Sequence, residues 1–215
     1  MNIYLSILSH DIIALITIIN PIAAASIMIS MLDGKATKEN IKPIALKATL
    51  TVLIASLITL FTGEFIFKIF GINVLSLKVI GGIILMLIAI NMAYGHASKA
   101  RHTPEEQSEA QEKEDISIVP IGIPILFGPG VIATIIVLNN NHVQVLPLPI
   151  SYLLVSVAIF VSSLVVYFTL LYASNINRAL GITGMKILTR IMGLIVGAIA
   201  AQFIISGVKG LWATL

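Results

Sequence analysis

The chain has 215 residues, of which 58% are hydrophobic and only 11% are charged, with a formal net charge of +3 and no cysteine. Soluble domains carry roughly 25% charged residues, so this composition excludes an ordinary water-soluble fold. The lack of cysteine excludes disulfides, thiolate nucleophiles and zinc–thiolate sites. A membrane protein is therefore predicted.

Six stretches are long and apolar enough to cross a hydrocarbon core, which is about 30 Å thick and needs roughly 20 helical residues. They are 12–32, 44–67, 74–94, 116–138, 150–173 and 187–208. We therefore predict an all-α polytopic membrane protein with six transmembrane segments in a single transmembrane domain, 1–215. A cleaved signal peptide over residues 1–25 is the alternative for the first stretch, but no Lys or Arg precedes its apolar run.

The first and fourth segments contain helix breakers. Asn20 and Pro21 interrupt the first, in "ITIINPIAAAS". Proline lacks an N–H and collides with the carbonyl one turn back, so a helix kinks or breaks there. Unpaired backbone groups are tolerated at membrane depth only inside protein or beside water, so the two breaks should face each other at the bundle centre. The breakers of the fourth segment are Pro120, Gly122, Pro124, Gly128, Pro129 and Gly130.

Basic residues are distributed unevenly between the two membrane faces, and this bias sets orientation. The first, third and fifth connections hold ten Lys and Arg residues, whereas the opposite face holds three, Lys68, Lys78 and Lys209. We predict that the odd-numbered connections are cytoplasmic and that both termini lie outside. The basic excess is thus a topology signal and gives no support for nucleic-acid binding. The ten residues are Lys35, Lys38, Lys42, Lys47, Lys99, Arg101, Lys113, Arg178, Lys186 and Arg190.

The third connection, 95–115, is the only long polar stretch of the chain, and six acidic residues fall between Glu105 and Asp115. Thr103 and Glu106 have the spacing of a capping box, so a short surface helix is expected there. We interpret this connection as a solvated cytoplasmic linker, with a regulatory or docking role as the alternative.

The two halves of the chain resemble each other. "IINPIAAASIMIS" matches "LFGPGVIATIIVL", and the stretch 70–92 matches 180–203. Three segments in each half force the second copy to enter the membrane from the opposite side. We predict two inverted repeats, 9–94 and 116–210, the arrangement that many secondary transporters use to open one central site to either side. A chance likeness of apolar segments is the alternative.

The breaks predict a binding site for a zwitterion. A half-helix that begins after each proline presents N–H groups and a partial positive charge, which suit a carboxylate. Carbonyls before the breaks, at Ile19, Asn20, Phe127 and Gly128, would receive an ammonium group. Proline kinks that only shape packing, and amides that only bridge helices, are the alternatives. The candidate substrate-binding residues are Asn20, Pro21, Ala23, Ala24, Phe127, Gly128, Pro129, Gly130, Asn91 and Gln202.

Other polar residues favour interfaces over chemistry. Glu64 is the deepest carboxylate, and its spacing to Lys68 is that of a helical ion pair, with proton relay as the alternative. Asp11 is expected at an outer helix end, and Lys47, Lys78, Lys186 and Arg190 are expected to reach lipid headgroups. The four histidines have no metal-binding spacing, and no catalytic motif is present, so neither a metal site nor an enzyme is predicted. Gly193, Gly197 and Ala201 form a close-packing face, within the chain or in a dimer.

The chain resembles the MarC family. The resemblance covers nearly the whole length and rests on "NPI" at 20–22, "FGI...KVIGGIILMLIAINM" at 70–92, "VPIGIPILFGPGVIAT" at 119–134 and "RIMGLIVGAIAAQFIISGVKG" at 190–210. It implies a multi-pass protein of a prokaryotic cytoplasmic membrane that transports small neutral amino acids such as glycine, alanine or serine. The family pattern after the first Asn-Pro, N-P-x-G-x-x-P, is replaced here by Ala23 and Ser26. This departure predicts a bulkier wall and a small ligand.

We therefore expect a secondary transporter of small neutral amino acids that works by alternating access. An exporter of amino acids or drugs is the alternative from the same class, and a non-transporting membrane scaffold is the alternative from another. The coupling ion stays open between H⁺ and Na⁺, since hydroxyls such as Thr17, Ser26 and Thr134 would serve sodium without a charge signature. No other cofactor is expected.

Overall fold

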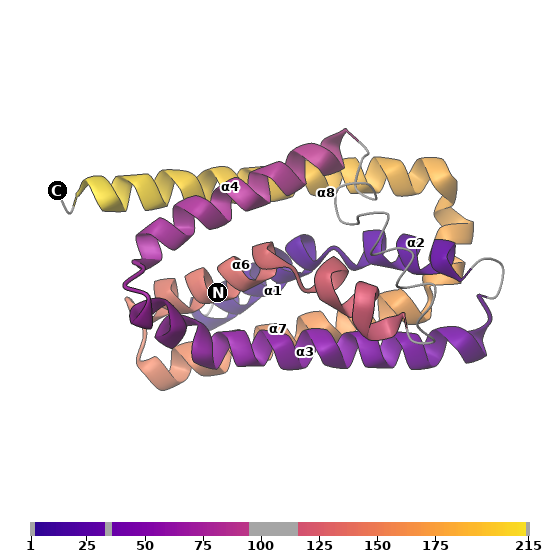
Figure 1. Cartoon of the computed structure of the whole chain (residues 1–215), viewed down its shortest axis with the longest axis horizontal. Helices are drawn as coiled ribbons and strands as arrows, with labels where there is room; N and C mark the ends of the chain where they lie inside the picture. Colours follow the sequence, from indigo (N-terminus) through magenta and orange to yellow (C-terminus); the bar gives the residue numbers. More distant parts are fainter. Residues whose placement is uncertain (1–2, 33–35, 95–115, 214–215) are drawn as a thin grey trace.

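The computed structural model describes residues 3–32, 36–94 and 116–213, and every element in these ranges is helical (Figure 1). The predicted capping box at Thr103 and the linker 95–115 lie outside the described residues. The elements are α1 (Ile3–Ile19), α2 (Pro21–Met31), α3 (Lys38–Ile69), α4 (Val74–Ala93), η2 (Ser117–Leu126), α6 (Pro129–Val143), α7 (Leu148–Leu171) and α8 (Ala173–Trp212).

The described helices provide six candidate membrane spans. Five are long and apolar enough by themselves, and η2 with α6 forms a sixth that is bent by 56°. The predicted all-α membrane fold is therefore confirmed, and the predicted segments 74–94 and 150–173 agree with α4 and α7 within two residues. The first span differs most, because it begins at Ile3 instead of residue 12.

The first and fourth spans are discontinuous, as predicted. Asn20 takes a left-handed conformation, with φ 50° and ψ 64°, and separates α1 from α2. In the fourth span, η2 is irregular, because Val119 and Ile123 have extended backbone angles. The Ile121 N–H reaches the Ile116 carbonyl and the Phe127 N–H reaches the Gly122 carbonyl, each five residues back. Each interruption is followed directly by a proline that starts the next helix.

The helices form three layers. α4 and α8 lie side by side on one face, α3 and α7 lie on the opposite face, and α1, α2, η2 and α6 lie between them (Figure 1). The interrupted spans therefore occupy the interior. The enclosure is clearest in α6, where every residue from Ala133 to Asn139 is buried.

Glycines allow α4 and α8 to approach each other at backbone distance. A Cβ on Gly82 of α4 would lie 2.8 Å from the Ala200 carbonyl oxygen, and a Cβ on Gly193 of α8 would lie 3.0 Å from the Ala89 carbonyl oxygen. Small residues at helix interfaces are typical of membrane proteins, where close van der Waals contact replaces the hydrophobic effect. Gly193 and Gly197 therefore serve packing within the chain.

The matched glycines of the two half-chain stretches share an uncommon conformation. Gly71, between α3 and α4, has φ 64°, and Gly181, inside α8, has φ 61°. An L side chain is strained at such angles, so both positions favour glycine. α4 and α8 also run antiparallel, since Gly207 near the end of α8 meets Leu75 near the start of α4. Both features agree with the predicted inverted repeat, which stays a prediction.

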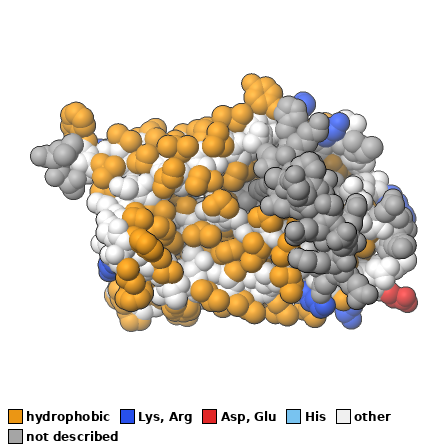
Figure 2. All heavy atoms as spheres, viewed as in Figure 1, with side chains coloured by type: hydrophobic (Ala, Val, Ile, Leu, Met, Phe, Trp, Pro, Cys, Tyr) orange, Lys and Arg blue, Asp and Glu red, His pale blue; other side chains and the backbone are white. Residues whose placement is uncertain are grey.

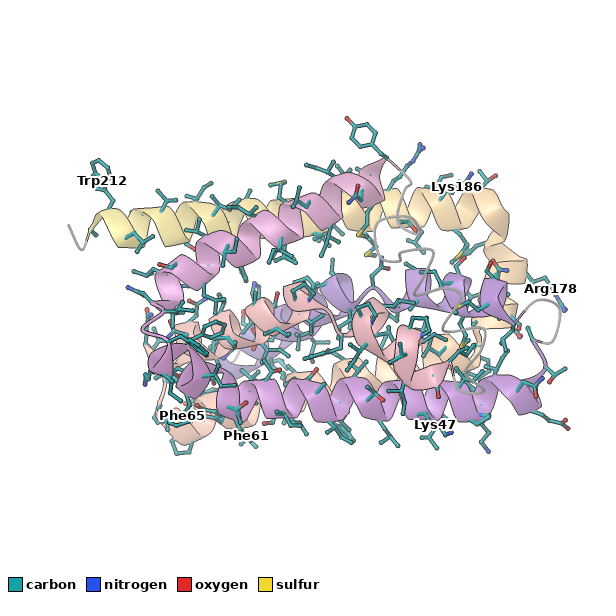
Figure 3. The ribbon with its side chains drawn as sticks, in the orientation of Figure 1. Lys47, Phe61, Phe65, Arg178, Lys186 and Trp212 are labelled. Carbon is teal, nitrogen blue, oxygen red and sulfur yellow. The ribbon has the colours of Figure 1, made fainter. Side chains whose placement is uncertain are left out.

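The surface is mostly apolar, and most of its visible charges gather toward one end. Hydrophobic side chains cover most of the visible face (Figure 2). Lys47, Arg178 and Lys186 lie toward one end of the long axis, whereas Phe65 and Trp212 lie toward the other (Figure 3). A basic excess at one end of the molecule is the asymmetry that sets the orientation of membrane proteins.

Replacing Gly193 by valine is expected to destabilise the fold, because the new side chain has no room between α8 and the Ala89 carbonyl. Overpacking of this kind costs roughly 1–3 kcal/mol. Ala198→Val is the matched control, since Ala198 is exposed on the same helix. Thermal unfolding of the purified protein should show a lower midpoint for Gly193→Val alone; equal midpoints would contradict the packing described here.

Candidate functional site

The two helix breaks border one cavity of about 400 Å³. Its walls come from α1, α2 and α4 in the first half of the chain and from η2 and α6 in the second. A volume of this size lies within the range of small-molecule sites. The lining residues are Ile18, Asn20, Ala23, Ile27, Ile84, Leu87, Ile88, Asn91, Met92, Pro124, Ile125, Leu126, Gly128, Pro129, Gly130 and Val131.

Six of the ten predicted site residues line this cavity, namely Asn20, Ala23, Asn91, Gly128, Pro129 and Gly130. Pro21, Ala24 and Phe127 are buried beside the breaks without lining it. Gln202 lies elsewhere, because α8 turns Ala200 and Phe203 inward and leaves Gln202 exposed. The structure therefore does not bring Gln202 to the predicted site.

Asn20 closes the start of α2 with its own side chain. Its Oδ1 accepts a hydrogen bond from the Ala23 N–H at 3.4 Å, and its carbonyl oxygen accepts one from the Ala24 N–H at 3.3 Å. Its Nδ2 donates to the Met92 sulfur of α4 at 3.9 Å, which ties the break to the opposite cavity wall. The predicted open N-terminus of α2 is thus partly satisfied, and the Asn20 carbonyl already accepts one hydrogen bond.

The start of α6 is more open. No side chain caps it, and the Gly128 carbonyl accepts hydrogen bonds from Val131 and Ile132, at 3.0 and 3.2 Å. The Gly128 carbonyl is therefore occupied, contrary to the prediction. The first N–H of the helix, at Gly130, makes no hydrogen bond within the part of the chain that the structure describes. This donor borders the cavity at a helix N-terminus, where a carboxylate is stabilised.

The side chain of Asn91 adds a polar group to the α4 wall. It lines the cavity and makes no hydrogen bond to any residue that the structure describes. An amide offers both a donor and an acceptor, so Asn91 has the chemistry to bind either end of a zwitterion. The rest of the α4 wall is mostly apolar, with Ile84, Leu87 and Ile88.

Charged residues outside the cavity give a mixed outcome. The predicted Glu64–Lys68 ion pair is confirmed, with 2.9 Å between Oε1 and Nζ. Asp11 was wrongly predicted at an interface: it is fully buried, because α1 begins eight residues before it and places it inside the span. Lys78 was also predicted to reach headgroups, but it is buried and its Nζ donates to Asn141 Oδ1 at 2.7 Å.

The sequence analysis missed a polar cluster at the end of α6. Asn139 accepts a hydrogen bond from the Ser151 hydroxyl at 2.9 Å, and His142 faces Asp11 at 3.4 Å. The run "NNNH" was the available signal, but ending the fourth segment at residue 138 made it look like a connection. No group of three or more potential metal ligands occurs among the described residues.

Comparison with known sequences identifies the family. The profile described as "MarC family integral membrane protein" matches residues 5–212. The chain belongs to the MarC family. It is similar to the UPF0056 membrane protein YvbG of Bacillus subtilis, with 34% identity over 98% of both chains. It is also similar to the UPF0056 membrane protein YhcE of Escherichia coli, with 34% identity over 94% of this chain and 92% of the relative.

MarC relatives extend to archaea. The UPF0056 membrane protein MJ1677 of Methanocaldococcus jannaschii is 34% identical over 92% of this chain and 93% of its own. No solved structure gives a significant match. The protein is therefore an integral, multi-pass MarC membrane protein with relatives in bacteria and archaea, and the names of these relatives state no substrate.

Substitutions at Asn20 should separate its two structural roles. Asn20→Gly removes the side-chain cap of α2 but tolerates a φ of 50°, and is expected to cost only about 0.3 kcal/mol, because glycine is itself a good N-cap residue. Asn20→Ala removes the cap and also strains the left-handed backbone, which adds about 1–2 kcal/mol. Thermal unfolding should therefore rank wild type above Asn20→Gly and Asn20→Gly above Asn20→Ala. An alanine variant as stable as the glycine variant would show that the conformation of Asn20 is not a constraint.

Proposed function

We propose that this MarC protein is a secondary transporter of small neutral amino acids, which it binds in the cavity between the two helix breaks. The observation that carries the proposal is the Gly130 N–H at the start of α6, which has no partner among the described residues and lies on the wall of a cavity that both halves of the chain build. Broken helices around a central site are the structural basis of substrate binding in many secondary transporters.

The lining favours a small zwitterion without a charged side chain. The substrate carboxylate would accept a hydrogen bond from Gly130, supported by the positive end of α6. The Asn91 amide oxygen would accept one from the ammonium group. None of the lining residues is charged, so a basic or acidic substrate side chain would lack a partner there. The apolar wall of Ile84, Leu87 and Ile88 suits a hydrogen or a methyl group, as in glycine or alanine.

The origin of the cavity walls supports a mechanism of alternating access. The first half of the chain provides α1, α2 and α4, and the second half provides η2 and α6. Movement of one half against the other would change the opening of the cavity without dismantling either break. The same cycle would serve an exporter, because the gradients across the membrane set the direction of net transport.

Glycine or alanine is expected to stabilise the purified protein against heat. A ligand at about 100 times its Kd contributes about 2.7 kcal/mol to the free energy of unfolding. Gly130→Val should abolish this gain, because even a Cβ at this position lies 2.8 Å from Leu85 Cδ2 and a larger side chain fills the space beside the N–H. In the Gly130→Val variant, uptake of labelled glycine into proteoliposomes should fall by about tenfold relative to the wild type. The reason is that the substrate carboxylate loses its hydrogen bond to the N–H of residue 130, and a hydrogen bond to a charged group contributes about 1.5–3 kcal/mol.

Ala198→Val, at a surface position of α8, is the control for that experiment and should keep the full response to glycine. A scaffold protein would show neither stabilisation nor uptake. If glycine, alanine and serine neither stabilise the wild-type protein nor are taken up by it, the proposed function is refuted. If Gly130→Val responds to glycine as the wild type does, the cavity is not the substrate-binding site.

We also propose a cytoplasmic membrane location with both termini outside, supported by the basic bias of the odd-numbered connections. Single cysteines test this directly, because the natural chain has none. In intact cells, a membrane-impermeant maleimide should label Phe70→Cys and not Lys186→Cys, both of which are exposed positions. Permeabilised cells should show labelling of both. The reverse pattern in intact cells would invert the predicted topology.

A further inference from the structure

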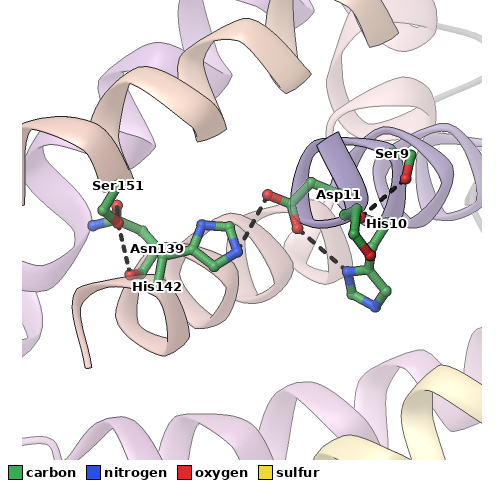
Figure 4. Close-up of polar contacts among 7 residues, drawn as sticks. Ser9, His10, Asp11, Asn139, His142 and Ser151 are labelled. Atoms are coloured by element: carbon green, nitrogen blue, oxygen red, sulfur yellow. Dashed lines mark hydrogen bonds and ion pairs between the residues drawn. The ribbon is translucent and has the colours of Figure 1, made fainter. Parts of the chain in front are cut away.

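A buried acid and a buried imidazole meet between the two interrupted spans. Asp11 of α1 is fully buried, and its Oδ2 lies 3.4 Å from Nε2 of His142, whose side chain is only 9% exposed (Figure 4). The other carboxylate oxygen, Oδ1, lies 3.3 Å from Nδ1 of His10, which is exposed. Both oxygens of this carboxylate therefore face imidazole nitrogens.

No lysine or arginine that the structure describes compensates Asp11. The nitrogens that lie beside its carboxylate in the described structure are Nδ1 of His10, at 3.3 Å, and Nε2 of His142, at 3.4 Å. The other titratable groups on the surrounding helices have partners elsewhere or are exposed. Lys78 of α4 donates to Asn141, and Glu64 and Lys68 of α3 pair with each other. Tyr152 of α7 stacks on Phe61, whereas Tyr4 of α1 and Lys209 of α8 are exposed.

This arrangement is costly unless it binds protons. With both imidazoles neutral, the carboxylate of Asp11 leaves one negative charge buried, and a buried charge without a cationic partner is strongly unfavourable. An ionisable residue inside a membrane span is by default a candidate for function. Nδ1 of His142 makes no hydrogen bond to any described residue. Oδ2 of Asp11 likewise makes no hydrogen bond to any described residue, although Nε2 of His142 lies 3.4 Å from it, so both members of the pair hold a buried polar atom without a partner.

We propose that Asp11 and His142 form the proton-binding site that couples the transport proposed above to a proton gradient. One proton binds to the pair, whose unpartnered buried atoms are Oδ2 of Asp11 and Nδ1 of His142. The charge of the pair changes from −1 to zero. The inference rests on the proposed function, and it selects the proton from the two coupling ions that the sequence left open.

The contacts of Asp11 favour a proton over sodium. Hard metal cations in proteins are bound by several oxygen ligands, whereas imidazole nitrogen is a strong proton acceptor. The described groups that contact the two carboxylate oxygens are imidazoles, from His10 and His142. A sodium ion at Asp11 would have to displace one of them.

The pair is connected to the substrate cavity through the two helices that carry it. Asp11 lies nine residues before Asn20 on α1, and His142 lies thirteen residues after Pro129 on α6. At 1.5 Å per residue, the pair is about 14 to 20 Å from the breaks along two continuous helices. The pair links α1 of the first half of the chain to α6 of the second half. Its charge therefore affects the distance between α1 and α6 as the two halves move.

Reconstituted protein gives the test, with labelled glycine as the probe. Wild-type proteoliposomes should accumulate glycine when the outside is acidic, and should also exchange it at equal pH. Asp11→Asn and His142→Gln should lower the pH-driven accumulation by about tenfold, a typical size for a coupling effect, while exchange is retained. A merely structural role of the pair would lower accumulation and exchange together, which would overturn the proposal.

One control isolates the buried pair. Glu64→Gln removes a carboxylate that pairs with an exposed lysine and lies outside the pair, so this variant should accumulate glycine as the wild type does. Accumulation by Asp11→Asn at the wild-type level would overturn the proposal. So would wild-type accumulation that follows a sodium gradient and ignores a pH gradient, although the transport function would then stand.

A measurement on the wild type decides the case even if both variants fail to fold. Addition of glycine to proteoliposomes that contain a pH-sensitive dye should acidify the interior as protons enter with the substrate. Glycine exchange without acidification would overturn the proton site and leave the proposed function intact. Absence of exchange by the wild type would refute the proposed function itself, and the proton site with it.

Discussion

The structure depends on one constraint, which is that backbone polar groups exposed at a helix break must find partners inside an apolar bundle. Asn20 meets it by capping α2 with its side chain and accepting from Ala24 with its carbonyl. The fourth span meets it with hydrogen bonds that reach five residues back and with the doubly used carbonyl of Gly128. The Gly130 N–H is the backbone donor that these hydrogen bonds leave without a partner among the described residues, and Gly130 lines the cavity.

The cavity wall on α4 depends in turn on the packing of α4 against α8. α4 contributes Ile84, Leu87, Ile88 and Asn91 to the wall, yet α8 contributes none of the lining residues. Glycines 82 and 193 set the distance between the two helices, because each approaches a backbone carbonyl of its partner. α8 thus supports the site from behind, and its influence on ligand binding is indirect.

The features that local chemistry decides could be predicted from the sequence. Pro21 and Pro129 fall in the middle of long apolar runs, where a proline kinks or breaks a helix, so both interruptions were predicted, and six of the ten candidate residues around them lie at one cavity. The features that were missed depend on tertiary packing. The start of α1 was placed too late because Ser9, His10 and Asp11 resemble a connection, and nothing local reveals that α6 and α7 pack against α1 there.

Gln202 shows the same limit in another form. Its position along the span agrees with that of Asn91, but the side on which it emerges is set by the glycine face that α8 presents to α4. A sequence repeat indicates which helices of the two halves correspond. It does not indicate which of two corresponding side chains lines the cavity between the halves. Only one of the two amides therefore lines the cavity.

The two breaks are equivalent in sequence position but not in chemistry, and this difference gives the cavity a direction. Asn20 provides α2 with an internal acceptor, so the positive end of that helix is already partly neutralised. Gly128 has no side chain to offer, so α6 keeps its first donor for a ligand. A zwitterion bound between two identical ends would have no preferred orientation. With one end capped, the proposed binding mode puts the carboxylate beside α6 and leaves the ammonium group to the amide of Asn91.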